Sequence, residues 1–405
     1  MVPSSGAAIA WWCVGVCVAS LWAVRVVQAL IGFRSLARLE EEPWISVARE
    51  RAAATWPKLV VVVPARNEAE SVERCLRTLL DTTYPRLRVV AVDDRSSDAT
   101  GEIMEKLKRE HSLGAALEVL HINELPKDED WLGKTHAMWR GAASSAAHDA
   151  QWVLFTDGDV FFHPEALTRA IAYAESERAD HVVVFPTMML ETMGETMMIA
   201  LFQTLFIFEH RAWRVSDPQA RDFIGVGAFN LVRRSAYEGI GTYEGLKMAV
   251  LDDMRLGERI KRAGFAQRVA YGRDLVRLRW AKGAMGVVRG LTKNAFALAD
   301  FTWWRALGLC LGVAFVLLTP YAGAVFAPGW AKAPFVLSIA VIWAMYAGMS
   351  RETEIAPGYM VTHPVAAGLF VYTIVRSMAV TMARGGVEWR GTVYPLETIR
   401  KMQQY

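Results

Sequence analysis

Two aspartates one residue apart, Asp157 and Asp159, follow an apolar run in the stretch WVLFTDGDVFFHPEAL, residues 152–167. The run is typical of a buried strand, and the intervening Gly158 lets both carboxylates leave the same side of an extended backbone. Two converging carboxylates suit a small cation that prefers oxygen ligands. An ordinary Asp-Gly turn at a strand end explains the same residues, so the pair alone does not decide between the two interpretations.

Further acidic residues follow two other apolar runs. Glu68 ends the stretch KLVVVVPARNE (58–68), and Asp93 and Asp94 lie in RLRVVAVDDRSSDATG (86–101). Each of them, taken singly, is a common turn residue. Together they place several negative charges on one edge of a sheet, where they repel each other. A bound cation, or a ligand rich in hydrogen-bond donors, is therefore the better explanation.

A nucleotide held at this edge needs contacts other than the usual phosphate-binding loops. The sequence has no G-x-x-x-x-G-K-[ST] motif, and no G-x-G-x-x-G follows the first strand. Acidic side chains suit the ribose hydroxyls and the N–H of a pyrimidine, while a metal ion on Asp159 neutralises a diphosphate.

The runs that carry these residues alternate between strand and helix patterns. Because the strand runs are apolar throughout, both of their faces should be covered, which predicts an α/β fold with a mainly parallel sheet and flanking helices. In such sheets, ligands bind beyond the carboxyl ends of the strands. Strands are predicted within 58–68, 86–101, 118–123 and 151–159, and helices within 71–80, 102–110 and 135–146.

The hydrophobic content, 53% with a mean hydropathy of +0.19, is high for a soluble enzyme. Residues 7–24 carry no charge and form a candidate membrane span. Arg34 and Arg38 follow this span and no charge precedes it, so the N-terminus should lie outside the cell and the next domain in the cytoplasm. The predicted organisation is a membrane anchor (1–40), a catalytic domain (41–300), transmembrane or interfacial helices (301–385) and a tail (386–405).

The side of the tail is a point on which two rules disagree. Three apolar segments, 306–327, 333–349 and 364–382, would put the tail outside if all of them crossed a membrane. The tail, however, carries Arg384, Arg390, Arg400 and Lys401, against Lys332 alone in the connection 328–334. This asymmetry places the tail inside, so we predict that one segment does not cross and that the protein is multi-pass in the cell (inner) membrane. The net charge of +3 gives no reason to expect a nucleic acid partner.

The motifs resemble, in order, those of the family 2 glycosyltransferases of GT-A fold. The resemblance runs over roughly residues 57–300, and within the family the chain looks most like hopene-associated and carotenoid-type lipid glycosyltransferases. This narrower likeness rests on the anchor and on three stretches, WLGK, GLTKNAF and VEWRGTVY. The stretches that carry the wider resemblance are VVVPARNEAESVERCLRTLL, VVAVDDRSSDATG, WLGKTHAMWRG, FTDGDVFFHPEAL, GVGAFNLVRRSAYEGIG and LDDMRLGERIKRAGF.

The resemblance implies a role for each matching residue. Asp157 and Asp159 match the D-x-D motif, in which the second aspartate usually binds a divalent metal, Mg²⁺ or Mn²⁺. Lys134 can add positive charge at the leaving diphosphate, although a lone lysine in a loop is more often solvated. The expected nucleotide-sugar donor is a UDP-sugar, and the residues implied at its uridine end are Pro64, Ala65, Asn67, Glu68, Asp93 and Asp94.

Asp252 and Asp253 stand where the family has an acidic pair, and the second member is the expected catalytic base. Simple capping of the helix that follows is the alternative explanation. The glycines around Gly227 suit close backbone approach on the acceptor side, although a plain turn explains them nearly as well. The Q/R-x-x-R-W motif appears only as VRLRW, which points to Arg279 and Trp280, and the tail has Thr392 where related proteins often show arginine. Trp389 and Arg390 are predicted to border the cleft.

The resemblance therefore predicts inverting transfer of a sugar to a membrane lipid, hopanoid or terpenoid in character. Three alternatives stay open. A polysaccharide synthase usually has more spans and an intact Q-x-x-R-W motif, while a polyprenyl-phosphate sugar transferase is possible because no motif identifies the acceptor. A non-catalytic membrane scaffold of the same fold would be favoured had Asp94, Asp159 or Asp253 been lost, and all three are present.

Overall fold

The computed structural model describes residues 5–126, 129–389 and 392–403. Internal contacts divide the chain into two units. The helical unit comprises Met1–Ser35, Leu190–Arg211 and Ala281–Trp389, and the sheet unit comprises Leu36–Met189, Ala212–Trp280 and Arg390–Tyr405. The segments Leu190–Arg211 and 281–300, which the sequence analysis assigns to the catalytic domain, thus have most of their contacts with the apolar helices.

The sheet unit is built on one eight-stranded sheet in the order β1-β10-β7-β9-β5-β2-β3-β4. Its neighbours pair in parallel, except that β9 pairs antiparallel with both β5 and β7. The predicted mainly parallel α/β fold is confirmed. The strands are β1 (Ala37–Arg38), β2 (Leu59–Ala65), β3 (Leu87–Asp94), β4 (Leu117–Ile122), β5 (Trp152–Phe155), β7 (His181–Phe185), β9 (Asn230–Arg233) and β10 (Gln267–Tyr271).

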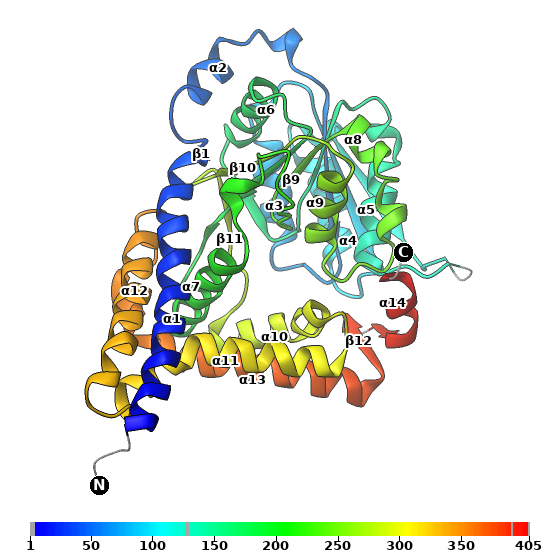
Figure 1. Cartoon of the computed structure of the whole chain (residues 1–405). Helices are drawn as coiled ribbons and strands as arrows, with labels where there is room; N and C mark the ends of the chain where they lie inside the picture. The colour runs from blue at the N-terminus through cyan, green and yellow to red at the C-terminus, as the bar shows by residue number, and fades with distance from the viewer. Residues whose placement is uncertain (1–4, 127–128, 390–391, 404–405) are drawn as a thin grey trace. The chain divides into compact units, whose positions relative to one another are not determined.

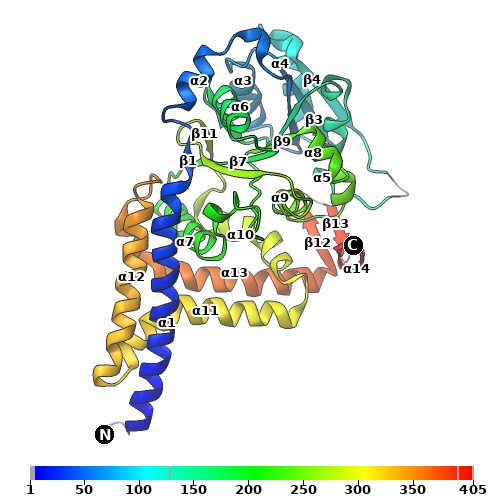
Figure 2. The same cartoon turned by 45° about the horizontal axis from the view of Figure 1, so that its top comes forward.

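The valine run of β2 explains how this sheet is covered. Successive side chains point to opposite faces of a sheet, and here Val61 and Val63 join the hydrophobic core on one face, whereas Val60 and Val62 join the core on the other. Helices cover both faces (Figures 1 and 2). The flanking helices are α3 (Val72–Leu80), α4 (Thr100–Glu110) and α6 (Ala166–Ser176) on the first face, and α5 (Gly133–Ala142), α8 (Arg234–Gly239) and α9 (Asp252–Arg262) on the second.

A small three-stranded sheet, in the order β6-β11-β8, completes this unit. Strand β6 (Val160–Phe162) begins directly after the Asp157–Asp159 turn and pairs antiparallel with β11 (Val276–Leu278), while β8 (Thr187–Met188) pairs with β11 in parallel. The remaining elements of the unit are the helix α2 (Trp44–Glu50), the tail strand β13 (Thr392–Pro395) and the tail helix α14 (Leu396–Gln403).

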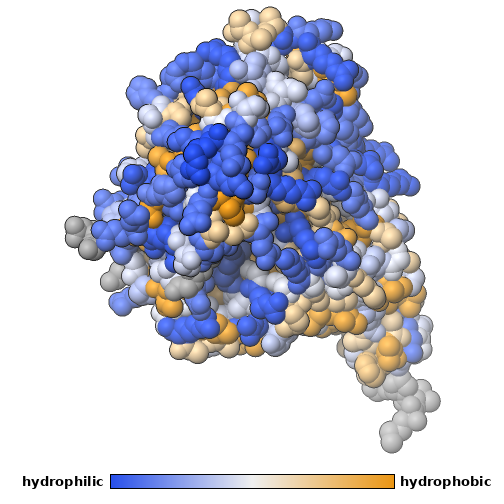
Figure 3. All heavy atoms as spheres, turned by 180° about the vertical axis from the view of Figure 1, so that it is seen from behind, coloured by the Kyte–Doolittle hydropathy of each residue, from blue (hydrophilic) through white to orange (hydrophobic). Residues whose placement is uncertain are grey.

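The helical unit contains helices suited to a membrane. Four helical segments in the described part of the chain are long and apolar enough to cross a bilayer: Gly6–Ser35, Trp303–Phe326, Gly329–Met349 and Pro357–Arg384. Of the large hydrophobic side chains that are exposed among the described residues, only Val47, Leu113 and Val393 belong to the sheet unit. Hydrophobic surface correspondingly gathers over the apolar helices in the space-filling view (Figure 3). The elements are α1 (Ser5–Gly32), α7 (Met193–Glu209), α10 (Gly283–Ala295), α11 (Trp303–Phe326), α12 (Ala333–Met349), α13 (His363–Arg384) and β12 (Gly386–Trp389).

Within the helical unit, α12 runs in the same direction as α1. The ring of Phe335, near the start of α12, lies 5.9 Å from that of Trp11, and Gly348, near its end, packs against Leu30. The end of α11 returns along α1 in the opposite direction, since the Trp22 indole donates a hydrogen bond to the carbonyl of Val316 at 3.1 Å, while Ala324 and Trp11 pack against the same small hydrophobic cluster. Helix α13 runs at a steep angle to both α1 and α12, and most of α11 lies alongside α13 (Figures 1 and 2).

Candidate active site

The residues predicted from β2 and from the Asp157–Asp159 turn lie next to each other. A Cβ atom added at Gly158 would stand 3.5 Å from the carbonyl oxygen of Pro64, 3.5 Å from Cβ of Ala65 and 3.8 Å from Cγ of Glu68. The turn therefore lies over the carboxyl end of β2. The parallel register, which pairs Ala65 with Asp93, brings the end of β3 to the same edge.

Asn67 and Glu68 hold two loops together at this edge. Asn67 has a left-handed backbone (φ 53°), its side-chain oxygen accepts a hydrogen bond from Ser97 N–H at 2.8 Å, and its own N–H donates to Ser96 Oγ at 3.1 Å. The Glu68 N–H donates to Thr100 Oγ1 at 2.8 Å. These hydrogen bonds fix the loop after β2 against the loop after β3. Asn67 and Glu68 therefore hold the two loops of the candidate site in place.

Asp93 and Asp94 differ in their partners. Asp93 accepts from Ser96 N–H at 3.1 Å and contacts Nδ1 of His121 at 3.0 Å, and this hydrogen bond raises the pKa of His121. Asp94 is buried, and its two oxygens accept from Nε and Nη2 of Arg95 at 2.7 and 3.0 Å. Arg95 was not singled out from the sequence, although it directly follows the acidic pair.

Lys134 forms ion pairs with two carboxylates of the predicted site, Asp157 and Asp252. Its Nζ lies 2.8 Å from Oδ1 of Asp157 and 3.3 Å from Oδ1 of Asp252. Burial lowers the pKa of this amine, but the two carboxylates raise it further, so the net shift is upward and the amine stays protonated. Lys134 is therefore not the solvated loop lysine that was the alternative to a role at the diphosphate; it carries a fixed positive charge beside Asp157.

Asp253 lies beside this cluster and contacts Gly227. The Gly227 N–H donates to Oδ2 of Asp253 at 2.9 Å, and Met254 N–H donates to Oδ1 at 2.8 Å. A Cβ atom at Gly227 would stand only 2.4 Å from Oδ2 of Asp157. A side chain at position 227 would therefore require the Asp157 carboxylate, which contacts Lys134, to move.

The two neighbouring aspartates have raised pKa values. Burial raises the pKa of Asp253 to about 6, the negative charge of Asp252 raises it as well, and Lys134 opposes both. Burial also raises the pKa of Asp252, again against Lys134. A carboxylate with a pKa near the working pH is a better proton acceptor than one at its ordinary value. Asp253 has this property, and Asp252 serves mainly as a partner of Lys134.

The structure brings Arg279 toward the Asp157–Asp159 turn through strand register. Leu278, which precedes Arg279, pairs with Val160, which follows Asp159, in the antiparallel β6–β11 pair. Trp280 packs against the hydrophobic core on the face of the main sheet that carries α3. Trp389 ends β12, and its side chain, like the whole of Arg390, lies outside the described residues.

The carboxylates at this edge suit a divalent cation with few protein ligands. Among the described residues, no group of three or more histidine, cysteine, aspartate or glutamate side chains is placed to hold a metal. Mg²⁺ and similar hard cations are usually held by one or two carboxylates together with substrate phosphates and water. Asp157 and Asp159 supply that number of carboxylates, so their donor set fits a metal that is completed by a bound diphosphate.

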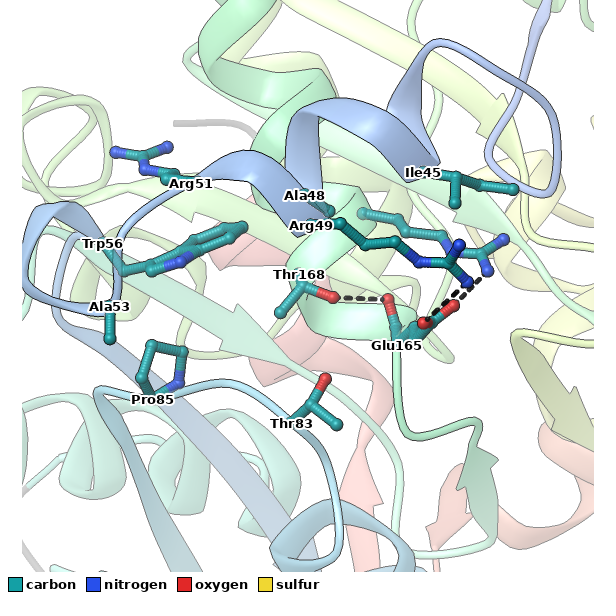
Figure 4. Close-up of a pocket in the computed structure, with 11 residues that line it drawn as sticks. Ile45, Ala48, Arg49, Arg51, Ala53, Trp56, Thr83, Pro85, Glu165 and Thr168 are labelled. Carbon is teal, nitrogen blue, oxygen red and sulfur yellow. Dashed lines mark hydrogen bonds and ion pairs between the residues drawn. The ribbon is translucent and has the colours of Figure 1, made fainter.

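A cavity elsewhere in the sheet unit has a different character. It has a volume of about 320 Å³, lies between α2 and the start of α6, and is lined by none of the predicted site residues (Figure 4). Its arginines are paired: Arg51 lies 2.6 Å from Glu175, Arg49 lies 3.6 Å from Glu165, and Arg169 also contacts Glu165. This network of ion pairs holds α2 on α6.

Comparison with known families gives a match to part of the chain. Residues 60–241 match the model of the family described as Glycosyl transferase family 2. This part of the chain is a family 2 glycosyltransferase domain. The match spans β2, β3, α5, the Asp157–Asp159 turn and Gly227, whereas Asp252 and Asp253 lie beyond it, so their assignment rests on the geometry above.

The curated relatives support the narrower resemblance. A protein of Staphylococcus haemolyticus named 4,4'-diaponeurosporenoate glycosyltransferase is 22% identical over 261 residues, which cover 64% of this chain and 66% of that relative. A protein of the same name from Staphylococcus aureus is 21% identical over 351 residues, covering 84% of this chain and 88% of the relative. The likeness to carotenoid-type glycosyltransferases inferred from the motifs is thus confirmed.

A solved structure confirms the fold. A mannosyltransferase from Pyrobaculum calidifontis, determined in complex with GDP-Man and Mn²⁺, superposes with a TM-score of 0.54 at 17% identity, covering 88% of this chain and 98% of the other. At this identity the likeness concerns the fold alone, which is the GT-A fold expected from the sequence.

Proposed function

We propose that this glycosyltransferase moves a sugar from a nucleoside-diphosphate sugar to a membrane lipid, with inversion at the anomeric carbon and with a divalent metal. One cluster of contacts at the carboxyl edge of the sheet carries the proposal. Lys134 pairs with Asp157 and Asp252. Gly227 lies against Asp157 and donates a hydrogen bond to Asp253. One protonated amine beside several carboxylates provides both a counter-charge for a diphosphate and a proton acceptor.

In the proposed reaction, Asp253 accepts the proton of the acceptor hydroxyl as the oxygen attacks the anomeric carbon. The bond from this carbon to the diphosphate breaks, and the nucleoside diphosphate leaves with the electron pair. Asp157 and Asp159 would hold the metal, which supplies positive charge to the leaving diphosphate. Lys134 adds a second fixed positive charge there, and Gly227 N–H orients the Asp253 carboxylate.

The donor is proposed to be a UDP-sugar, with the uridine end held near Asp93, Asp94 and the Asn67–Glu68 loop. The acceptor is proposed to be a carotenoid-like or other terpenoid lipid. Two observations support it: the curated relatives are named for a carotenoid acid acceptor, and the helical unit exposes many large apolar side chains. A polyprenyl-phosphate acceptor is the second candidate, because it enters from the same bilayer.

Lipid extraction tests the proposal directly. Cells that express the protein, and matched cells that express the Asp253→Asn variant, are extracted and their lipids compared by mass spectrometry. We expect a species heavier by one hexose, on a neutral or carboxylic terpenoid, only with the active protein. If the new species is instead a lipid that carries the sugar through a phosphate, the acceptor is a polyprenyl phosphate. If the lipids of the two strains do not differ, lipid glycosylation is rejected.

The pH profile of the reaction is expected to reflect Asp253. A carboxyl group accepts a proton only when it is deprotonated, so kcat/KM should rise as the pH rises through its pKa, about 6. In an Asp252→Asn variant the neighbouring negative charge is gone, which lowers the pKa of Asp253, so the acidic limb should move to lower pH. Steady-state kinetics at saturating Mn²⁺ measure the position of this limb. A limb that stays in place in the variant would belong to another group.

The position of the tail bears on membrane topology. The Arg66 guanidinium donates to Thr392 Oγ1 at 3.1 Å, and Gly133 N–H donates to the Tyr394 hydroxyl at 3.1 Å, so β13 belongs with the catalytic domain. The chain between residues 281 and 391 must then cross the membrane an even number of times. Because α12 and the end of α11 run in opposite directions beside α1, while α13 runs at a steep angle to α1 and α12, we propose that α13 is the segment that does not cross. Its Arg376 agrees with an interfacial position.

We therefore predict that the tail lies in the cytoplasm with the catalytic domain. A cysteine introduced at residue 403, in a variant whose four native cysteines are replaced by alanine, should resist a membrane-impermeant maleimide in intact cells and react after lysis. A cysteine at residue 2, on the far side of the anchor, serves as the positive control. Labelling of residue 403 in intact cells would show that the tail, and with it the catalytic domain, lies outside.

A further inference from the structure

The C-terminal tail contacts the part of the domain that carries the donor-binding candidates. Tyr394, in β13, is only 6% exposed, and its hydroxyl accepts a hydrogen bond from Gly133 N–H at 3.1 Å. Gly133 is the first residue of α5, and the next residue is Lys134. The first N–H groups of a helix have no partner within the helix, so a buried one needs an acceptor from elsewhere. The tail supplies that acceptor across 261 positions of sequence.

The same hydroxyl also meets the end of β3. The Arg95 guanidinium holds both oxygens of Asp94, and these bonds, with a smaller contribution from Tyr394, raise the pKa of Arg95 against the effect of burial. A Cβ atom at Gly133 would stand 2.3 Å from Oδ2 of Asp94 and 2.4 Å from Nη2 of Arg95. Asp94, Arg95, Gly133 and Tyr394 are therefore packed without space between them.

Two further contacts secure the tail in this place. Thr392 accepts a hydrogen bond from Nη1 of Arg66, which lies between Ala65 and Asn67 in the loop after β2. Ile399, in α14, is fully buried. The tail thus touches three separate elements at the carboxyl edge: the loop after β2, the end of β3 and the start of α5.

We infer that Tyr394 is a positioning residue of the donor site, an inference that rests on the proposed function. Its hydroxyl fixes the start of α5, and with it Lys134, relative to Asp94 and Arg95. Lys134 has to meet the diphosphate while Asp94 has to meet the nucleoside, so their separation must match the donor. Because the tail follows the last apolar helix, the donor site is completed only after the chain has passed through all of those helices.

The Tyr394→Phe variant tests this role, because it removes the hydroxyl and keeps the ring. We expect binding of UDP in the presence of Mn²⁺ to weaken by roughly 3- to 10-fold, the size expected for one lost hydrogen bond. The KM for the donor should rise by a similar factor, while the KM for the acceptor stays unchanged. Val393→Ala, at the exposed neighbouring position whose side chain points to the other face of β13, is the matched control and should change neither.

The experiment uses the full chain in detergent or nanodiscs, with UDP and GDP as probes, and hydrogen exchange of the α5 amides as a second measurement. Faster exchange at Gly133 in Tyr394→Phe, together with weaker nucleotide binding, supports the role. Unchanged or tighter binding overturns it, since tighter binding would make the tail an obstruction. If Tyr394→Phe does not fold, the Thr392→Val variant replaces it, because this change removes only the hydrogen bond to Arg66. We expect Thr392→Val to raise the KM for the donor to a smaller extent. An unchanged KM for the donor overturns the role of the tail.

Failure of the proposed function gives a different result. In that case the wild-type chain binds neither UDP nor GDP with Mn²⁺ and transfers no sugar, although Tyr394→Phe still accelerates exchange at Gly133. A failure of the inference alone leaves wild-type binding and transfer intact and leaves the donor KM of Tyr394→Phe equal to that of Val393→Ala.

Discussion

Replacement of Asp253 by asparagine is expected to lower kcat by about 10²–10⁴-fold, the usual contribution of a general base. Asparagine keeps the shape of the side chain and one acceptor oxygen, so the hydrogen bond from Gly227 N–H can persist. What is lost is the ability to take a proton from the acceptor hydroxyl. Binding of UDP and Mn²⁺ should survive, because Asp157 and Asp159 are unchanged.

Two comparisons make this result specific. Asp274→Asn, an equivalent change at an exposed turn residue with a left-handed backbone (φ 57°) that asparagine tolerates, should leave both kcat and nucleotide binding as they are. The acid limb of the pH profile, which the wild type owes to Asp253, should also be absent from the residual activity of Asp253→Asn. If the variant instead lost UDP binding and kept its rate at saturating donor, Asp253 would be a binding residue and not the base.

The strands at the centre of the sheet were predictable because their local composition indicates that they are buried. An uninterrupted valine run such as Val60–Val63 can be covered only from both faces, and this requirement leads to parallel strands with helices on each side. Polar residues at the ends of such strands then have one place to meet. For this reason the sequence alone predicts that Glu68, Asp93 and the Asp157–Asp159 turn share one edge of the sheet.

Contacts between distant segments were not predictable in the same way. Nothing local marks Tyr394 as the acceptor for Gly133 N–H, because the partner lies 261 positions away and the hydrogen bond forms only when the tail folds back. The antiparallel strand β9 was missed since its four residues lack a period of their own. The motif predicts Lys134 near the diphosphate, but its ion pairs with Asp157 and Asp252 depend on the starts of α5 and α9 meeting at the turn after β5.

Removal of the divalent metal is expected to have an effect as large as the loss of the base. A metal that neutralises charge on a leaving group contributes several kcal/mol, so chelation should slow transfer by about 10³-fold or more. Added Mn²⁺ or Mg²⁺ should restore the rate. The fixed charge of Lys134, 2.8 Å from Asp157, leaves some stabilisation of the diphosphate, which is why a residual rate is expected in place of complete loss.

Asp159→Asn should reproduce the chelated state in the presence of excess metal, because the amide retains an oxygen but loses the negative charge that holds a hard cation. Asp157→Asn should differ, since it also releases Lys134 from one of its two partners and thereby alters the charge beside Asp252. Electron paramagnetic resonance measures the binding of Mn²⁺ to the UDP complex. This measurement distinguishes the effects of the two variants from a folding defect. Full turnover in excess chelator, or Mn²⁺ affinity in Asp159→Asn equal to that of the wild type, would mean that the Asp157–Asp159 turn does not hold the metal.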